Sequence, residues 1–298
     1  MGLHRNVVSS WARAIKQKRW VIYDNVSVGP ANHVIDLFNS VFPSNLQHER
    51  LEEQGAKLNE LWGSGLHFVY NNQSNSTLGK DGYDNYQAPC DDEGNGLFKR
   101  RMWVRGTLDF RIASEKHFDG TIRCEEAVHS IRTVGESTFV NIHRDFTDHH
   151  GNPLLKETRT LVYSNDDYQG RTLTHSYPQY DSTIALKLTP VSLLKYSMLT
   201  YNLHKIHYDK QYCQEIEQLP NTIVHGPFMV TLALYWFRQL HPNVNFEKFT
   251  YKNIEPCFVD EEITLAYSKD SESEYNIAII NKNLGKKYLD GFLALRTI

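Results

Sequence analysis

The chain has 298 residues, of which 40% are hydrophobic and 22% are charged, and this composition excludes a disordered or collagen-like protein. The 32 basic and 35 acidic side chains give a formal net charge of −3, which argues against a protein that coats nucleic acid. No run of about 18 apolar residues is present, so we expect no membrane-spanning helix. The length fits one large domain or two ordinary ones.

Residues 1–20 differ in charge from the rest of the chain, because the first acidic residue is Asp24. The segment contains five basic side chains and, at helical spacing, one apolar face formed by Val7, Val8, Trp11, Ala14 and Ile15. A basic, amphipathic segment without acidic residues is typical of a mitochondrial targeting peptide. We therefore expect the protein to be located in the mitochondrial matrix. The alternative is an ordinary first helix of the folded protein.

Helical spacing of apolar residues recurs within 31–62, where Pro43 ends the first run. Residues 71–98 are rich in Asn, Gly, Ser and Asp, which predicts a long loop. From 101 to 163 the apolar period changes to two, as at Leu108 and Phe110, which predicts strands. Residues 166–180 are polar and contain Gly170 and Pro178, so we expect a linker there.

Four potential proton-transfer or ligand side chains lie within residues 199–209: Asn202, His204, His207 and Asp209. Histidine transfers protons near neutral pH, and a neighbouring Asn can orient a ring, a hydroxyl or a water. His204 and His207 could instead bind a metal, but no third ligand stands at suggestive spacing. From residue types alone, a cluster of surface histidines is equally compatible with the pattern.

A helix that is apolar on nearly every side is predicted for residues 228–240, so it must be buried. His225, Gly226 and Pro227 precede it directly. Pro suits the first turn of a helix, and Gly lets the backbone approach a ligand closely. Free N–H groups at this helix end could stabilise a developing oxyanion, although a plain capping turn is the alternative.

Four strand-like runs follow between residues 246 and 295, and the last two resemble the strand, turn and strand that close the first half. We interpret this as a weak internal repeat of roughly 130 residues. It predicts an α+β double hot-dog fold, in which each antiparallel sheet wraps around a central helix. The predicted units are residues 21–165, without catalytic residues, and the catalytic residues 181–298.

The segment 199–209, followed by Val224-His225-Gly226, resembles the motif of MaoC-like hydratases and dehydratases of the hot-dog superfamily. Three further stretches resemble the 3-hydroxyacyl-thioester dehydratases of fungal mitochondria: residues 61–70, 78–82 and 100–103. The resemblance extends from about residue 20 to the end. It implies dehydration of (3R)-3-hydroxyacyl thioesters to trans-2-enoyl thioesters in type II fatty acid synthesis, with His207 as the base at C2. It also implies substrate binding by Gly226 and His225, with the N–H of Gly226 donating to the thioester carbonyl.

The chain departs from the wider motif at two positions, because it has Asn202 where many relatives have a catalytic Asp, and His204 where they have Asn. An amide cannot donate or accept a proton as a carboxyl group does. Asn202 could therefore only orient the leaving hydroxyl, and His204 or Asp209 could supply its proton. A third option is that His207 carries the C2 proton to the hydroxyl.

Other interpretations stay open at this point. The same scaffold could hydrate a branched or dicarboxylic enoyl-CoA, or bind acyl thioesters without catalysis. Arg100, Arg101 and Trp103 could hold two domains together or contact a substrate phosphate. The resemblance implies an acyl-thioester partner, on acyl carrier protein or coenzyme A. It implies a monomer of two fused hot dogs or a homodimer. We expect no nucleic acid, no metal and no cofactor. The four separated cysteines predict neither disulfides nor structural zinc.

Overall fold

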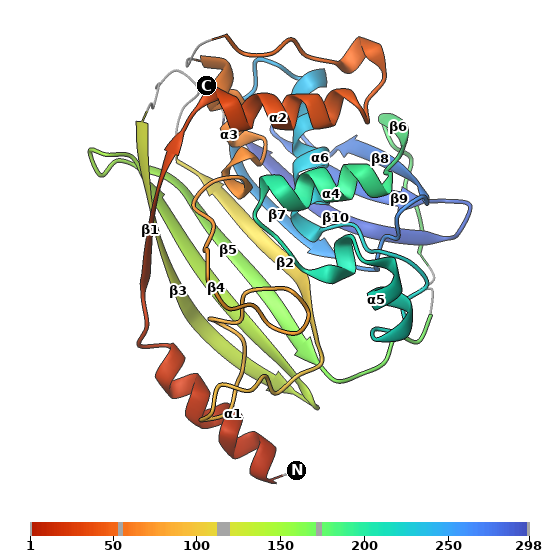
Figure 1. The fold of residues 1–298 in the computed structure, drawn as a ribbon. Coiled ribbons are helices and arrows are strands. Elements are labelled where there is room, and N and C mark those ends of the chain that lie inside the picture. The colour runs from red at the N-terminus through yellow and green to blue at the C-terminus, as the bar shows by residue number, and fades with distance from the viewer. Residues whose placement is uncertain (1, 53–55, 112–119, 171–174, 297–298) are drawn as a thin grey trace.

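The computed structural model describes residues 2–52, 56–111, 120–170 and 175–296. Ten strands form one antiparallel sheet in the order β1-β3-β4-β5-β2-β7-β10-β9-β8-β6 (Figure 1). The strands are β1 (Trp20–Val26), β2 (Arg100–Phe110), β3 (Gly120–Val134), β4 (Ser137–Thr147), β5 (Pro153–Ser164), β6 (Ser182–Lys187), β7 (Phe246–Asn253), β8 (Glu262–Lys269), β9 (Glu274–Asn281) and β10 (Lys286–Leu295). We call β1–β5 the first half of the sheet and β6–β10 the second half.

The two halves meet where β2 pairs with β7, which makes the sheet continuous. At this junction Gly106 of β2 lies opposite Tyr251 of β7. A Cβ on Gly106 would collide with the Tyr251 side chain and would lie 2.7 Å from the carbonyl oxygen of Thr158. The absence of a side chain therefore allows three strands to pack closely at the centre of the molecule.

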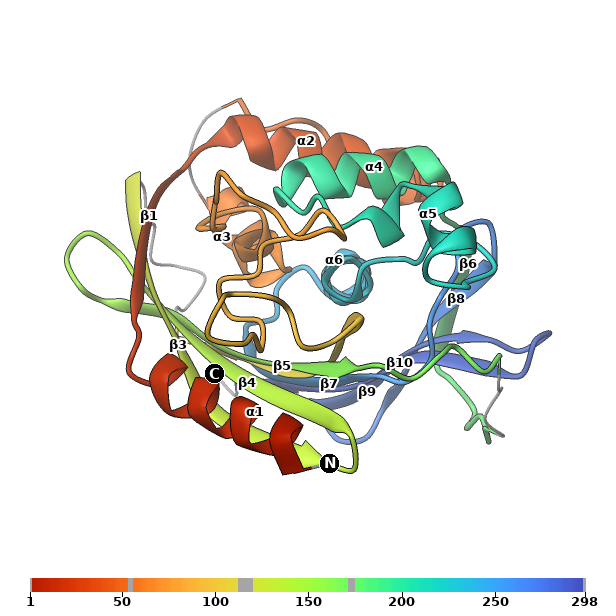
Figure 2. The same ribbon diagram turned by 60° about the horizontal axis from the view of Figure 1, so that its bottom comes forward.

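The helix α6 (Gly226–Leu240) lies over the concave face of the sheet and is seen end-on in Figure 2. Its side chains from Pro227 to Arg238 are all buried, which confirms the predicted buried helix. The helices α2 (Val28–Asn39) and α4 (Pro190–Leu199) cover it on the side away from the sheet. In the first half of the sheet, the corresponding place is taken by the shorter α3 (Ala56–Gly63), whose Trp62 is buried.

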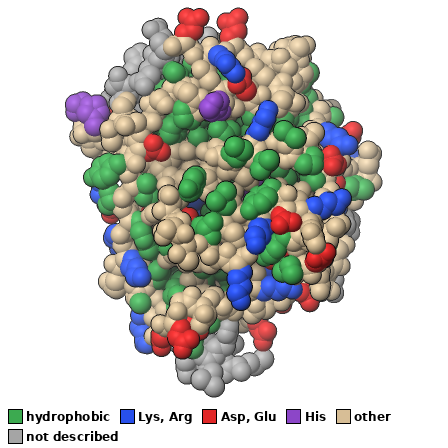
Figure 3. Space-filling model, viewed as in Figure 1, with side chains coloured by type: hydrophobic (Ala, Val, Ile, Leu, Met, Phe, Trp, Pro, Cys, Tyr) green, Lys and Arg blue, Asp and Glu red, His purple; other side chains and the backbone are tan. Residues whose placement is uncertain are grey.

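The loop that follows α3 confirms the expectation for residues 71–98, which contain no helix or strand apart from one isolated bridge. The predicted linker is likewise irregular where it is described, and residues 171–174 lie outside the described residues. The sequence interpretation missed α4 and β6. At the start of α4 the Thr189 side chain accepts the N–H of Ser192, and the Ser192 side chain accepts the N–H of Thr189. Such a pair of residues at this spacing indicates a helix start. Figure 3 shows hydrophobic side chains spread among charged ones on the face that carries α2 and α4.

The helix α1 (Gly2–Ile15) packs on the first half of the sheet, near β4 (Figure 2). Trp11 and Ile15 are 8% and 3% exposed and contact a cluster that contains Val128 and Ile142. The predicted apolar face is confirmed for these two residues and for the buried Val8, whereas Ala14 is exposed. In the described part of the chain, no helix has both the length and the apolar composition needed to cross a bilayer.

Candidate active site

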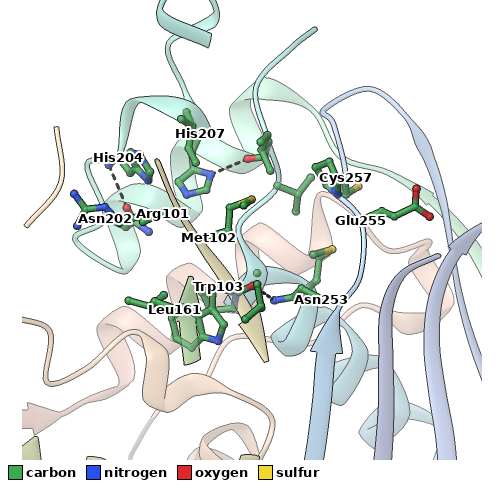
Figure 4. Close-up of a pocket in the computed structure, with 18 of the residues that line it drawn as sticks. Arg101, Met102, Trp103, Leu161, Asn202, His204, His207, Asn253, Glu255 and Cys257 are labelled. Atoms are coloured by element: carbon green, nitrogen blue, oxygen red, sulfur yellow. Dashed lines mark hydrogen bonds between the residues drawn. The ribbon is translucent and has the colours of Figure 1, made fainter. Parts of the chain in front are cut away.

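A cavity of about 250 Å³ lies between the two halves of the sheet (Figure 4). β2 lines one side with Arg101, Met102 and Trp103, and the segments before and after α5 (Lys210–Glu215) line the opposite side. The lining is mostly apolar, with a few polar side chains, as in many small-molecule sites. The polar groups of the second half in this lining are Asn202, His204, His207, the backbone at Gly226, Asn253 and Glu255.

His207 ends a 3₁₀ turn, Lys205–His207, and its ring points into the cavity. Its Nδ1 lies 2.7 Å from the carbonyl oxygen of Ile223. Because a carbonyl can only accept, we assign the ring hydrogen to Nδ1, which leaves the lone pair on Nε2. Burial lowers the pKa of His207 to about 4, so the ring is neutral at pH 7. His207 thus has the form that a general base requires.

His225 lies directly behind His207, with ring centroids 3.6 Å apart. Its Nε2 lies 2.8 Å from the hydroxyl oxygen of Ser197, and its side chain is 1% exposed. The ring is absent from the cavity lining, so the structure does not bring the predicted substrate-binding side chain to the substrate space. Burial, together with the nearby His207 and His204, holds the pKa of His225 well below its usual value. His225 supports the ring of His207 instead.

Gly226 is the first residue of α6, where backbone N–H groups have no partner within the helix. A Cβ at this position would lie 2.6 Å from Nδ2 of Asn253 and 3.4 Å from Cβ of Trp103. The missing side chain therefore lets β2 and β7 approach the helix end. Among the described residues the Gly226 N–H has no backbone partner, so it remains available to a ligand oxygen at the positive end of the helix.

Asn253 and Trp103 form the opposite wall and were not predicted as a pair. Nδ2 of Asn253 donates to the carbonyl oxygen of Trp103 at 2.8 Å, and the indole N–H of Trp103 donates to Tyr251 at 2.9 Å. The Oδ1 of Asn253 is buried without a hydrogen-bond partner in the described part of the chain. Only the family resemblance of residues 100–103 indicated this wall, because Asn253 ends a strand without any motif of its own.

Asn202 and His204 both line the cavity, as the sequence predicted for neighbouring site residues. Oδ1 of Asn202 accepts the backbone N–H of His204 at 3.1 Å. This bond leaves the amide nitrogen of Asn202 for a ligand and sets the direction in which the chain enters the 3₁₀ turn. His204 and His207 have ring centroids 5.6 Å apart, so two imidazoles border one substrate space.

Asp209 does not reach this space. Its side chain accepts the N–H of Tyr212 at 2.9 Å and caps the start of α5, and it is absent from the cavity lining. A capping role satisfies the free donors of a helix start, which explains the preference for Asp there. Of the two predicted auxiliary acids, the structure therefore brings only His204 to the cavity.

The family model that describes hydroxyacyl-thioester dehydratase type 2 matches residues 65–259, which include the whole of the cavity lining. The chain belongs to the hydroxyacyl-thioester dehydratase type 2 family. The enzyme of this name from Schizosaccharomyces pombe, called mitochondrial, is 28% identical over 69% of this chain and 77% of its own length. Its namesake from Saccharomyces cerevisiae, also called mitochondrial, is 24% identical over 87% of this chain and 91% of its own length.

The fold of this dehydratase-family chain is also that of solved MaoC-like proteins. A MaoC-like dehydratase from Phytophthora capsici superposes with a TM-score of 0.65 at 15% identity, covering 96% of this chain and 98% of its own. The predicted α+β hot-dog class is thereby confirmed. Within the described residues no group of three or more His, Cys, Asp or Glu side chains is placed to hold a metal ion.

Two arginines at the start of β2 have different partners in this family member. Nε of Arg100 donates to Glu217 at 2.7 Å, which links β2 to the segment after α5. Arg101 points to the cavity side, where it pairs with Asp81 at 2.6 Å and donates to the carbonyl oxygen of Asp84 at 2.8 Å. Arg100 thus joins the two halves, which agrees with the interpretation that it holds two domains together. Arg101 contributes a charge to the cavity.

Proposed function

We propose that the protein dehydrates (3R)-3-hydroxyacyl thioesters to trans-2-enoyl thioesters, and hydrates the enoyl thioesters in the reverse direction. The observation that carries this proposal is a neutral, fixed imidazole at His207 beside the free helix N-terminus at Gly226, in one apolar cavity. Removing a thioester α-proton requires a base within hydrogen-bond reach and stabilisation of the enolate oxygen. His207 supplies the base, and the N–H of Gly226 supplies the stabilisation.

In this proposal the thioester carbonyl accepts from Gly226, so the negative charge that develops on its oxygen lies at the positive end of α6. Nε2 of His207 takes the proton from C2. The amide of Asn202 orients the hydroxyl on C3, since an amide can bind a hydroxyl without exchanging its own proton. The apolar side chains Met102, Leu161 and Met229 of the lining accommodate the start of the acyl chain.

The setting that we propose is type II fatty acid synthesis in the mitochondrial matrix, with the acyl group on acyl carrier protein or coenzyme A. The names of the two fungal relatives support the organelle. The basic, amphipathic residues 1–20 support targeting to it. We further propose that residues 181–298 carry the catalytic histidine, and that the fused halves act as a monomer or within a homodimer.

The test is hydration of trans-2-hexenoyl-CoA by the full-length protein, followed by the loss of enoyl absorbance. We expect activity in the parent and a fall in kcat of about 100-fold or more for His207→Ala, the range of general-base roles. The exposed His149→Ala is the matched control and should keep the parental rate. Unchanged activity of His207→Ala would refute its role. A parent inactive on both carrier-protein and CoA substrates would favour a protein that only binds acyl thioesters.

A further inference from the structure

Dehydration breaks the bond between C3 and the hydroxyl oxygen, and hydroxide leaves poorly unless it is protonated. The proposed roles of His207, Gly226 and Asn202 do not supply that proton, because Asn202 has only an amide. The remaining titratable side chains of the cavity lining are Tyr83, Arg101, His204, Glu255 and Cys257. Glu255 lies 2.6 Å from His175 and also accepts the N–H of Lys287, so its carboxylate is already occupied.

Of the other groups His204 lies beside His207, and a carboxylate from the first half of the chain faces it. Nε2 of His204 lies 3.5 Å from Oδ2 of Asp81, and the two side chains are 9% and 15% exposed. Nδ1 of His204 has no hydrogen-bond partner among the residues that the structure describes. One ring nitrogen therefore faces a carboxylate, while the other is left for an oxygen in the cavity, an arrangement that orients and activates an imidazole.

The loop that carries Asp81 is fixed closely to the segment of the site histidines. The backbone N–H of Lys205 donates to the carbonyl oxygen of Asp81 at 2.8 Å, and its Nζ donates to the carbonyl oxygen of Lys80 at 3.0 Å. Gly82 has a φ of 81°, and a Cβ there would lie 2.5 Å from the carbonyl oxygen of Leu203. Asp81 is thus held against His204 by backbone contacts and by the Lys205 ammonium, independently of the Asp81 and His204 side chains.

We infer that Asp81 is a positioning residue that holds the ring of His204, and that His204 transfers the proton at the C3 oxygen of the substrate. This inference rests on the proposed function. It makes the catalytic site composite, because Asp81 belongs to the first half of the chain. The predicted unit 21–165 would then lack a catalytic residue but contribute a necessary side chain.

The proton transfers balance without any further reactant. In dehydration His207 takes the C2 proton, the electrons of that C–H bond form the double bond between C2 and C3, and the C3–O bond breaks. The protonated His204 gives its proton to the departing oxygen, so water leaves and the proton is now on His207. Its return to His204 resets the enzyme. In hydration the neutral His204 takes a proton from the attacking water, and His207 returns one to C2.

Three groups besides Asp81 face His204: the guanidinium of Arg101, the imidazole of His207 and the ring of Tyr83, 5.7 Å away. Burial, Arg101 and His207 hold the pKa of His204 well below its usual value. Both imidazoles are therefore mostly neutral at pH 7, and the dehydration step above starts from the fraction of molecules in which His204 has bound a proton.

The test separates the two proton transfers by changing the leaving group. The full-length protein acts on (3R)-3-hydroxyhexanoyl-CoA and on (3R)-3-chlorohexanoyl-CoA, whose chloride leaves without a proton. We expect Asp81→Asn and His204→Gln to lower kcat on the hydroxy substrate by about tenfold to 100-fold, with KM nearly unchanged. On the chloro substrate both variants should retain the parental rate within about threefold, and Asp81→Glu should partly restore activity on the hydroxy substrate.

Lys80→Ala is the matched control on the same loop, since it is the backbone carbonyl of Lys80 that contacts the site segment. It should keep the parental rate on both substrates. Equal losses on both substrates in Asp81→Asn would show that Asp81 only maintains the structure and would overturn the inference, as would full activity on the hydroxy substrate. Different results would refute the proposed function: a parent protein that forms no enoyl product, or a His207→Ala variant that is fully active.

Discussion

At the scale of single residues, the site depends on how burial acts on imidazoles. As whole residues, His204, His207 and His225 are each at most 7% exposed, and burial is the largest cause of the lowered pKa of all three. A neutral imidazole can take a proton at pH 7, whereas an exposed imidazole with the ordinary pKa of 6.5 is still partly protonated at that pH. The spacing in the sequence predicts that these histidines are candidate site residues. Their burial, however, depends on how the two halves pack together.

Gly226→Ala tests the approach of the helix end to the opposite wall. The added Cβ meets Nδ2 of Asn253 at 2.6 Å, so either the Asn253 amide moves and loses its hydrogen bond to Trp103, or α6 and β7 move apart; both change the wall that the N–H of residue 226 faces. We expect kcat/KM for enoyl-CoA hydration to fall at least about tenfold, a typical cost of a misplaced catalytic group. Gly29→Ala is the control, because no atom lies within 4 Å of its added Cβ. Equal activity of both variants would contradict this role of Gly226.

How far the sequence predicts this site depends on the distance between the partners along the chain. His207 and Gly226 stand in local patterns, a histidine segment and a His-Gly-Pro helix start, and the structure brings both to one cavity. Asp81 and Asn253 have no such pattern, since each reaches the site only through long-range strand pairing and loop packing. Asp209 was chosen for its carboxyl group, but a helix start directly after it uses that group as a cap.

At the scale of elements, the helices that were predicted correctly are those whose apolar residues give a clear burial pattern. The run 228–240 is apolar on nearly every side and had to be a buried helix, as α6 is. α4 escaped notice because its surface side carries apolar side chains, with Val191 and Met198 60% and 70% exposed, which blurs the expected periodicity. Strand order could not be predicted either, because β2 pairs with β5 and β7, both distant in sequence.

The packing of α1 gives a prediction at this scale. Trp11→Ala removes a side chain that is 8% exposed and leaves a gap against β3 and β4. We expect the free energy of unfolding to fall by about 3 kcal/mol, at the low end for Trp-to-Ala changes in cores. Lys16→Ala, at an exposed position just after the helix, should have no measurable effect. Chemical denaturation of the full-length protein measures both, and equal midpoints would show that α1 does not stabilise the fold.

At the scale of the whole molecule, the first half buries charge where the second half buries its long apolar helix. Arg144, 2.9 Å from Glu126 and 3.3 Å from Glu157, is fully enclosed, and Arg159 pairs with Glu157 at 2.7 Å. His67 lies 3.8 Å from the same Glu157. Removing one member would leave an unpaired buried charge, so this cluster constrains the first half as strictly as an apolar core would.

Buried neutral histidines predict a loss of stability in acid. Burial lowers the pKa of His67 to about 3 and that of His207 to about 4, whereas unfolded histidine titrates near 6.5. Between pH 6.5 and 4 the unfolded chain therefore binds more protons than the folded one. The stability of the fold is thus complete above pH 6.5 and declines as the pH falls through this window.

Thermal melting between pH 8 and 4 measures this decline. His207→Gln should show a shallower fall in melting temperature over the window, and the exposed His149→Gln should match the parent. Glu157 does not interfere, because Arg159 and Arg144 outweigh its burial and hold its pKa at about 2, below the window. A parent whose melting temperature is flat from pH 6.5 to 4 would contradict the neutral state of these rings.

The docking of α1 has a consequence for the route that the chain takes in the cell. An amphipathic helix has one apolar face, and that face can be bound by only one partner at a time. With Trp11 and Ile15 packed on the sheet, an import receptor finds the face already occupied. If residues 1–20 act as an address, as we propose, recognition competes with folding in time, and the slow pairing of distant strands favours recognition first. Sorting would then be decided by the rate at which the sheet closes.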